Sequence, residues 1–466
     1  MKIIKLVLLL LVVVVLFSSH IAAQWTQTAL KNSIIHALVV SKDTSGNDLI
    51  FAGTCWGGGI YLSTDIGATW NPVNTGLPQF ESFVIFDLSL VPDSTGKNIN
   101  LLATGAICFG GSMFFPRMYR SVNNGASWAI VDSGLTSNCA NGVAVIHNGS
   151  GKTSIYAGTA GIGEYEEGSG VYRSTNFGAS WKPVNNSFFK IPQDTSRCYN
   201  INDLVTDGSN LFAATNAGVF CSADQGENWT PLNSGLINLD VHSLAFVPNG
   251  SGNDYLFAGV PAEKGEGGIY FSSNFGISWN PANSGLTNLD IATVIVCPKN
   301  NGGNDLFVAT SGGVFLSTDY GMHWSAINSG FTNMWITSLA VTKTHLFAGT
   351  YGGGENSGVW QRPLSEMIIT NVELTGSAFP KRYELFQNYP NPFNPTTTIN
   401  YQIVKDGPVT LKIFDLLGRE VAMLVNEKKD AGSYSVQWRA NGPSGIYFYT
   451  LTAGKYSVTK RMVFIK

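Results

Sequence analysis

Short apolar runs alternate with polar turn residues along most of this chain, and the same order of runs recurs. Each unit contains a run that ends in small residues, as in LIFAGT (49–54), and then a Gly- or aromatic-led run, as in GIYLST (59–64). Each of these two runs occurs seven times. A third apolar run precedes each pair, as in HSLAFV (242–247), and a fourth begins at a tryptophan, as in WNPVN (70–74). Such alternating runs, separated by Gly, Asn and Asp, are typical of antiparallel strands.

An octapeptide of the form Ser-x-(Asp/Asn)-x-Gly-x-x-Trp joins each Gly- or aromatic-led run to the tryptophan run that follows it. It occurs six times, from STDIGATW (63–70) to STDYGMHW (317–324), with successive serines 58, 53, 48, 50 and 45 residues apart. A period near 50 indicates a propeller or a solenoid, and four strands per unit favour propeller blades. The last unit has GVWQRP (358–363) but no octapeptide, whereas WTQTAL (25–30) matches a tryptophan run. We therefore expect an all-β chain whose seven-bladed β-propeller is closed by an N-terminal outer strand.

The octapeptide has the residues that a tight turn needs. The Asp or Asn side chain can accept backbone N–H bonds, and the Gly supplies a positive φ. Half of the copies carry Asn, a change that a general acid or a metal ligand would not tolerate. We interpret the third position as structural in all six copies: Asp65, Asn123, Asn176, Asp224, Asn274 and Asp319.

Both ends of the chain differ from the repeats. Residues 1–23 combine Lys2 and Lys5 with an apolar run (6–17) and a small-residue end, which predicts a signal peptide; a retained membrane anchor is the alternative. No other run is long enough to span a membrane. We expect the propeller over 24–363, a linker over 364–385 and a small Ig-like β-sandwich over 386–466. This last block carries ten Lys or Arg against five Asp or Glu, a net +5, while 24–385 carry a net −10.

Composition excludes some functions and permits others. Only 13% of the residues are charged and the net charge is −3, so nothing indicates nucleic-acid binding. Export would permit disulfides. Cys55 with Cys108 and Cys139 with Cys198 are the plausible pairs, because we place each pair in matching loops of adjacent blades; free thiols are the alternative. The Cys and His residues form no close cluster in the sequence, so we predict no metal site. We also expect no cofactor.

Candidate binding residues lie on one face of the expected propeller. The octapeptide turns occupy one face, which leaves the loops between the second and third strands, and between blades, on the other. There the repeats diverge most, and aromatic and acidic side chains could stack on sugars or hold a cation. A solvated acidic face is the plainer alternative. The candidates are Trp56, Glu164, Tyr165, Glu166, Asp240, Glu263, Glu266, Asp290, Trp335, Tyr351 and Glu355.

The octapeptides resemble the Asp-box (bacterial neuraminidase) repeat. The resemblance implies the turn and the propeller class, but such repeats occur in sialidases, sortilin-type receptors, photosystem II assembly factors and xyloglucan-cleaving glycosidases. Sialidases need an arginine triad, and here no Arg-Ile-Pro segment precedes the first octapeptide. The xyloglucan-cleaving enzymes use two propellers, where we expect one. Non-catalytic relatives match better.

The last block resembles the type IX secretion sorting domain of Bacteroidetes and related bacteria. That resemblance rests on YELFQNYPNPFNPTTTINY (383–401), FDLLGREV (414–421), AGSYSVQW (431–438), SGIYFYTL (444–451) and KRMVFIK (460–466). It implies passage through the periplasm and across the outer membrane by the type IX machinery. The domain is often removed in this family, with the cargo released or attached to lipopolysaccharide.

Two functions remain open. The first is a secreted or cell-surface binding or scaffold protein, monomeric and without catalytic residues, whose ligand is a glycan or another surface protein. The alternative is a glycoside hydrolase or lyase that acts on extracellular polysaccharide at the same loops. Two carboxylates facing each other across a cleft would favour the hydrolase.

Overall fold

The computed structural model describes residues 24–465 except 57, 93–98, 110–111, 136–139, 148–152, 161–169, 186–189, 192–193, 249–253, 263–265, 300–302, 368–382, 386–387, 389–390 and 430–431. The chain divides into two compact units, Met1–Ile368 and Ile369–Lys466. The expected signal peptide and most of the expected linker lie outside the described residues. No helix within the described ranges is long and apolar enough to cross a membrane.

Four-stranded antiparallel sheets, seven of them within the described residues, make up most of the first unit. The first sheet contains β2 (Ile35–Lys42), β3 (Asp48–Thr54), β4 (Ile60–Ser63) and β5 (Asn71–Pro72), and the second contains β6 (Phe83–Pro92), β7 (Ile99–Phe109), β8 (Ser112–Ser121) and β9 (Ala129–Ile130). The third contains β10 (Ala140–His147), β11 (Thr153–Thr159), β12 (Gly170–Ser174) and β13 (Lys182–Pro183). The fourth contains β16 (Ile201–Thr206), β17 (Leu211–Thr215), β18 (Gly218–Ser222) and β19 (Thr230–Pro231).

The other three follow the same plan. They are β20 (Ser243–Val247), β21 (Tyr255–Val260), β22 (Gly268–Ser272) and β23 (Asn280–Pro281); β24 (Ile291–Pro298), β25 (Asn304–Thr310), β26 (Gly313–Ser317) and β27 (Ser325–Ala326); and β28 (Ile336–Val341), β29 (His345–Thr350) and β30 (Gly358–Pro363) with β1 (Thr26–Lys31). The hairpin of β14 (Lys190–Ile191) and β15 (Asp194–Cys198) stands apart, and the 3₁₀ helix η3 (Leu364–Glu366) follows β30.

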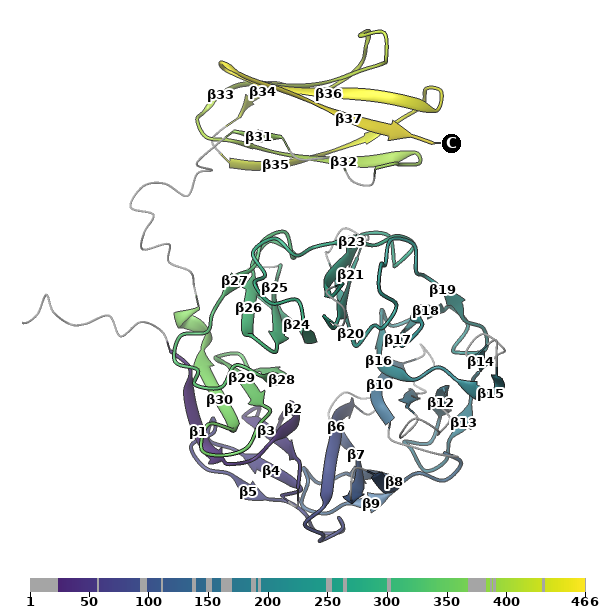
Figure 1. Ribbon diagram of the computed structural model, residues 1–466, viewed down its shortest axis with the longest axis vertical. Coiled ribbons are helices and arrows are strands. Elements are labelled where there is room, and N and C mark those ends of the chain that lie inside the picture. Colours follow the sequence, from purple (N-terminus) through teal and green to yellow (C-terminus); the bar gives the residue numbers. More distant parts are fainter. Residues whose placement is uncertain are drawn as a thin grey trace, which may run out of the picture. The chain divides into compact units, whose positions relative to one another are not determined.

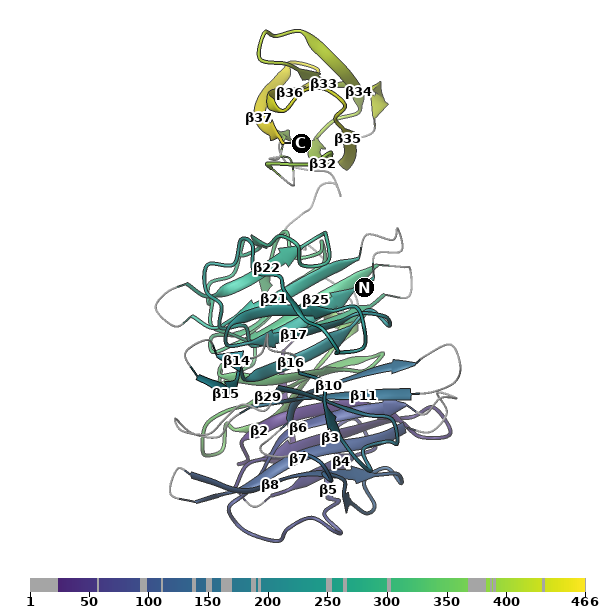
Figure 2. The same ribbon diagram turned by 90° about the vertical axis from the view of Figure 1, so that its right-hand side faces the viewer.

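The sheets surround a common axis, as in a β-propeller. Figure 1 shows the first strand of each sheet innermost and the two-residue fourth strands outermost, and Figure 2 shows the sheets from the side. Each first strand packs against the next, and β28 packs against β2, so the ring is closed. The N-terminal strand β1 pairs with β30, with Thr26 opposite Gln361, and supplies the fourth strand that the last sheet lacks.

Apolar side chains fill the space between neighbouring sheets. The second strands contribute most, because both of their faces are covered; all seven residues of β11 are buried. One of these clusters joins Phe51 of β3 and Ile60 of β4 to Phe83, Tyr119 and Trp128 of the next sheet. Equivalent clusters recur around the ring. The apolar runs that end in small residues, which form the second strand of each sheet, are therefore the core of the first unit.

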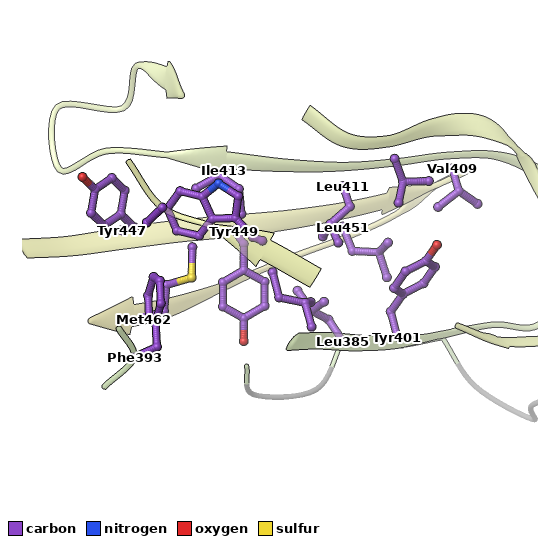
Figure 3. Packing of buried hydrophobic residues seen from close by; sticks show 14 of the residues in the cluster. Leu385, Phe393, Tyr401, Val409, Leu411, Ile413, Tyr447, Tyr449, Leu451 and Met462 are labelled. Atoms are coloured by element: carbon purple, nitrogen blue, oxygen red, sulfur yellow. The ribbon is translucent and has the colours of Figure 1, made fainter. Parts of the chain in front are cut away.

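The second unit is a sandwich of two sheets. One contains β31 (Glu384–Leu385), β32 (Thr396–Ile403) and β35 (Gly432–Arg439), and the other contains β33 (Gly407–Phe414), β34 (Glu420–Lys429), β36 (Gly445–Ala453) and β37 (Tyr456–Phe464). Figure 3 shows side chains from both sheets meeting between them, such as Tyr401 of β32, Leu411 of β33 and Leu451 of β36.

The expected disulfide between Cys55 and Cys108 is not formed, because both residues are free thiols. The register gives the reason. Ile50 pairs with Ser63, and Leu101 pairs with the equivalent serine, Ser121, so Ile50 and Leu101 are equivalent positions. Counting five residues on from each, Cys55 is equivalent to Ala106. Cys108 lies two positions farther along β7. Cys108 thus belongs to a longer hairpin and not to the matching loop. The pair of Cys139 and Cys198 stays a prediction, since Cys139 and the side chain of Cys198 are not described.

Candidate functional site

The Ser and Asp side chains of the octapeptide turns bond within their own turn. In the first copy the N–H of Gly67 donates to Ser63 Oγ at 2.8 Å, and that hydroxyl donates to Asp65 Oδ1 at 2.9 Å. Thr69 donates its N–H to Oδ1 and its hydroxyl to Oδ2 of Asp65. The Thr69 bonds hold the pKa of Asp65 below its ordinary value, so this carboxylate stays ionised and is no general acid.

Asn replaces Asp in these turns without loss of bonds. Asn123 Oδ1 accepts the N–H of Ser127 at 2.9 Å, and its Nδ2 donates to the Ser127 hydroxyl at 2.9 Å.

The turn also has a feature that the sequence did not indicate. The residue before each Gly has a positive φ of 53–63°, although it is Ile, Asn, Phe, Gln or Tyr. The surrounding bonds therefore hold two consecutive left-handed residues in each turn.

The tryptophan of each octapeptide bonds to the preceding sheet. Trp128 Nε1 donates to the Val73 carbonyl at 2.7 Å, and Trp279 Nε1 donates to the Leu232 carbonyl at 2.7 Å. Trp25 makes the same bond to the Ile327 carbonyl at 2.6 Å. These tryptophans link successive sheets, so the octapeptides have a structural role.

The loops between the second and third strands lie on the opposite face from the octapeptide turns. Thr54 at the end of β3 pairs with Ile35 at the start of β2, while Ser63 at the end of β4 opens the octapeptide. We call the face with the β3–β4 loop and its equivalents the loop face. The segments that join one sheet to the next reach their first strands on this face.

Three of the joining segments share one turn. Asn238, Asn288 and Asn333 each accept, through Oδ1, the N–H of the residue two positions later, at 2.9, 2.9 and 3.1 Å. Those later residues are Asp240, Asp290 and Trp335. The turn thus places these three predicted side chains at equivalent positions, each just before the first strand of its sheet.

A pocket of about 450 Å³ lies on the loop face where three sheets meet. It is lined by His242, Pro261, Ala262, Asp290, Ile291, Ala292, Ser311 and Trp335. Ser311 and Pro261 follow second strands, whereas Asp290 and Trp335 precede first strands. The pocket therefore joins two predicted residues, Asp290 and Trp335, to two polar residues that the sequence analysis missed, His242 and Ser311.

Hydrogen bonds hold the polar wall of this pocket in place. Asp290 Oδ1 accepts the N–H of Ala262 at 3.3 Å, and the N–H of Ser311 donates to the Asp290 carbonyl at 3.3 Å. The Asn288 side chain donates to Ser311 Oγ at 3.2 Å. Beside the pocket, His242 Nε2 lies 3.3 Å from Asp240 Oδ2. A carboxylate, a hydroxyl and an imidazole are thus fixed at one site.

Trp335 gives the pocket an aromatic wall. Its side chain is 52% exposed although it is a large apolar group. Tyr351 packs against it, with ring centroids 4.4 Å apart, and the Tyr351 N–H donates to the Trp335 carbonyl at 2.9 Å. The Tyr351 ring therefore packs against the Trp335 indole, and the indole remains open to solvent.

Other predicted residues are not brought to this pocket. Trp56 is 59% exposed, has a φ of 59° and does not line it. Glu266 and Glu355 are exposed and do not line it either. The remaining candidates, Glu164, Tyr165, Glu166 and Glu263, lie outside the described residues.

Two carboxylates on the first strands were not among the candidates. Burial raises the pKa of Asp87 to about 6, a value to which the nearby Asp203 also contributes. Burial likewise raises the pKa of Asp203 to about 6. The Ser89 hydroxyl donates to Asp87 at 2.7 Å, and the Leu244 N–H donates to Asp203 at 2.9 Å. Asp203 thus links β16 to β20. A hint existed in the sequence, since Asp87 interrupts the mostly apolar strand FVIFDLSLVP.

Comparison with known families agrees with both units. Residues 387–466 match the model of the secretion system C-terminal sorting domain, and residues 13–212 match a β-propeller domain model, DUF6242. The chain carries a secretion sorting domain. This type IX sorting domain indicates export across the outer membrane to the cell surface or the extracellular space. No curated protein matches the sequence.

Solved structures resemble the propeller at low identity. YCF48 from Cyanidioschyzon merolae is 17% identical with a TM-score of 0.48, covering 73% of this chain and 98% of its own. An α-L-arabinanase of Penicillium chrysogenum, complexed with arabinobiose, is 16% identical with a TM-score of 0.40 and the same coverages. A putative gluconolactonase is 12% identical with a TM-score of 0.39, covering 74% and 92%. At these TM-scores the similarities carry no argument about function.

Proposed function

We propose that this exported propeller is a glycan-binding protein whose ligand occupies the loop-face pocket. The observation that carries the proposal is the open indole of Trp335 beside the fixed polar groups of Asp290, Ser311 and His242. Aromatic faces stack on the apolar face of a sugar ring, and carboxylate, hydroxyl and imidazole groups bind sugar hydroxyls. The volume falls in the range of about 300–1,000 Å³ typical of small-ligand sites.

Binding is favoured over hydrolysis by the number of carboxylates. A glycosidase of the usual kind needs two carboxyl groups on either side of the scissile bond, about 5–10 Å apart. Among the described residues that line the pocket, Asp290 is the only carboxylate. Its neighbour Asp240 is engaged with His242. One carboxylate can orient a sugar but cannot supply both of the carboxyl groups that this mechanism needs.

The proposal also includes a division of the chain into domains. We take the seven sheets as the complete propeller over 24–363, with residues 1–23 as a signal peptide that is removed. The sandwich over 386–466 is then an Ig-like domain that is cleaved after export, leaving the propeller free or attached to surface lipopolysaccharide. The propeller acts as a monomer, because one pocket formed within one chain suffices for binding.

The test is a binding assay of the purified full chain against a polysaccharide panel, with release of reducing ends measured in parallel. Trp335→Ala should weaken binding at least tenfold, since it removes the aromatic wall. Trp56→Ala is the matched control, because Trp56 is also more than half exposed on the loop face but lies outside the pocket. It should change affinity less than twofold.

Three outcomes would contradict the proposal. Release of reducing ends that Asp290→Asn abolishes would make the chain a glycoside hydrolase. Equal losses in the Trp335→Ala and Trp56→Ala variants would move the binding surface away from the pocket. Retention of a surface protein by the full chain, with no polysaccharide bound, would assign the loop face to a protein partner.

A further inference from the structure

The turn between β33 and β34 exposes two adjacent leucines. We call residues 415–419, Asp-Leu-Leu-Gly-Arg, the leucine turn. Leu416 is 67% exposed and Leu417 is 76% exposed, more than any other large apolar side chain described in the second unit. Turn positions ordinarily hold Gly, Pro, Asn, Asp or Ser. Two leucines here therefore contribute nothing to the sandwich core and need another explanation.

The leucine turn is held in one conformation. Asp415 Oδ1 accepts the N–H of Leu417 at 2.9 Å and that of Arg419 at 3.0 Å. The Gly418 N–H donates to the Asp415 carbonyl at 3.0 Å, and Gly418 has a φ of 77°. Both leucines are thus presented by a pre-organised turn, which lowers the entropy lost when they bind a partner.

The charged groups around the leucines are paired within the hairpin. Arg419 Nε donates to Asp415 Oδ2 at 2.7 Å, and Lys412 Nζ donates to Glu420 Oε2 at 2.8 Å across the two strands. The net charge of these four groups is zero. The leucine turn therefore offers a partner apolar surface and little electrostatic attraction.

The neighbouring hairpin of the same sheet has no large apolar side chain at its tip. Ala453 pairs with Tyr456, so Gly454 and Lys455 form the tip between β36 and β37. Strand β34, by contrast, continues the apolar surface with Val421 and Met423, which are 46% and 45% exposed. It is also an edge strand of its sheet. The two most exposed apolar side chains described in the second unit therefore lie together in this hairpin, while Ile446 and Ile465 are exposed elsewhere, at 37% and 50%.

We propose that the leucine turn is the docking element by which the secretion machinery recognises this sorting domain. The partner is a protein component with an apolar pocket that receives Leu416 and Leu417. The sorting-domain match requires that some surface of residues 387–466 be recognised. This surface is rigid, apolar and internally neutralised, so recognition depends on shape and apolar burial and is nearly independent of salt.

The test is export of the full chain in a bacterium with a type IX system. The double variant Leu416→Ser with Leu417→Ser should reduce the exported fraction at least tenfold and leave the protein in the periplasm. Lys455→Ser is the matched control at the neighbouring tip and should be exported normally. Both purified variants should unfold at the wild-type temperature, because exposed substitutions change stability little.

Conservative variants keep the proposal falsifiable if the serine variant misfolds. Leu416→Met with Leu417→Met keeps an apolar tip and should be exported within twofold of wild type. Normal export of a folded serine variant would overturn the proposal. Tenfold loss of export in a folded methionine variant would also overturn it. Cosedimentation of the wild-type chain, but not the serine variant, with protein-free lipid vesicles would assign the turn to a membrane surface instead.

Discussion

Trp25 donates its indole N–H to the carbonyl of Ile327, 302 residues later in the chain, at 2.6 Å. The backbone N–H of Trp25 donates to Ser329 as well, at 2.8 Å. Trp128 and Trp279 make the same two bonds to the sheets that precede theirs. Trp25 is therefore the missing tryptophan of the last unit, although it lies at the opposite end of the sequence.

Removing this closure should destabilise the whole propeller. We expect Trp25→Ala to lower the free energy of unfolding by about 3–5 kcal/mol, the usual cost of deleting a buried aromatic side chain. Denaturant unfolding of the full chain measures this. Trp56→Ala, which deletes an exposed tryptophan, should change it by less than about 0.5 kcal/mol. Similar values for the two variants would show that the Trp25 side chain is not needed for closure.

The octapeptide Asp224 should tolerate Asn but not Ala. Asp224 accepts the Ser222 hydroxyl at 2.9 Å and the Asn228 N–H at 2.8 Å through Oδ1, and an Asn carbonyl can accept both. Its Oδ2 accepts Asn228 Nδ2 at 2.7 Å, and an Asn amide keeps a bond there when the Asn228 amide turns over to present its oxygen. We expect Asp224→Asn to stay within about 0.5 kcal/mol of wild type and Asp224→Ala to lose about 1–3 kcal/mol. Thermal unfolding separates the two. Equal losses would mean that the negative charge itself matters in this turn.

Asp87 should make stability depend on pH. Its pKa is raised to about 6 in the folded state, so the folded protein holds this proton more tightly than the unfolded chain does. That contribution to stability is complete below about pH 4 and is lost as the pH rises through about 6. Asp87→Asn, which cannot ionise, should match wild type at pH 4 and be more stable at pH 8 by about 1–3 kcal/mol.

Urea unfolding at several pH values tests this. The Asn side chain can still accept the Ser89 hydroxyl, so the comparison isolates the charge. A variant that is less stable than wild type at pH 8 would show that the ionised carboxylate is stabilised by its surroundings.

Cys55 should react slowly with alkylating reagents. Burial raises the pKa of this thiol from 9.0 to about 11, with Cys108 adding to the effect. Only the thiolate reacts, so at pH 8 we expect alkylation about a hundredfold slower than for the unfolded chain. Mass spectrometry of the iodoacetamide-treated protein gives the rate. A crosslinked peptide that contains Cys55 and Cys108, with neither alkylated, would restore the disulfide expected from the sequence.

Much of the fold could be read from the sequence because its signals are local. The Ser, Asp and Gly of an octapeptide lie within five residues, and their hydrogen bonds form within one turn. The strands also follow directly from alternation and turn chemistry. The second left-handed residue of each turn was missed, since positions such as Phe177 and Tyr320 have no local preference for that conformation.

The candidate site was foreseen only in part. The sequence analysis named Asp240, Asp290 and Trp335 as candidates, and the structure shows that each ends the same Asn-containing turn. Their equivalence, however, does not say which of them share a pocket. His242 and Ser311 join Asp290 and Trp335 there because three neighbouring sheets converge at that point.

The sequence alone determined the repeating unit, the octapeptide turns and the sorting domain, since each depends on residues close together in the chain. Only the tertiary structure decided that Cys108 lies two positions beyond the residue that matches Cys55, and that His242 and Trp335 face one pocket. These relationships depend on strand register and on packing between sheets. Both are set by contacts between segments far apart in the chain, and no local sequence pattern specifies those contacts.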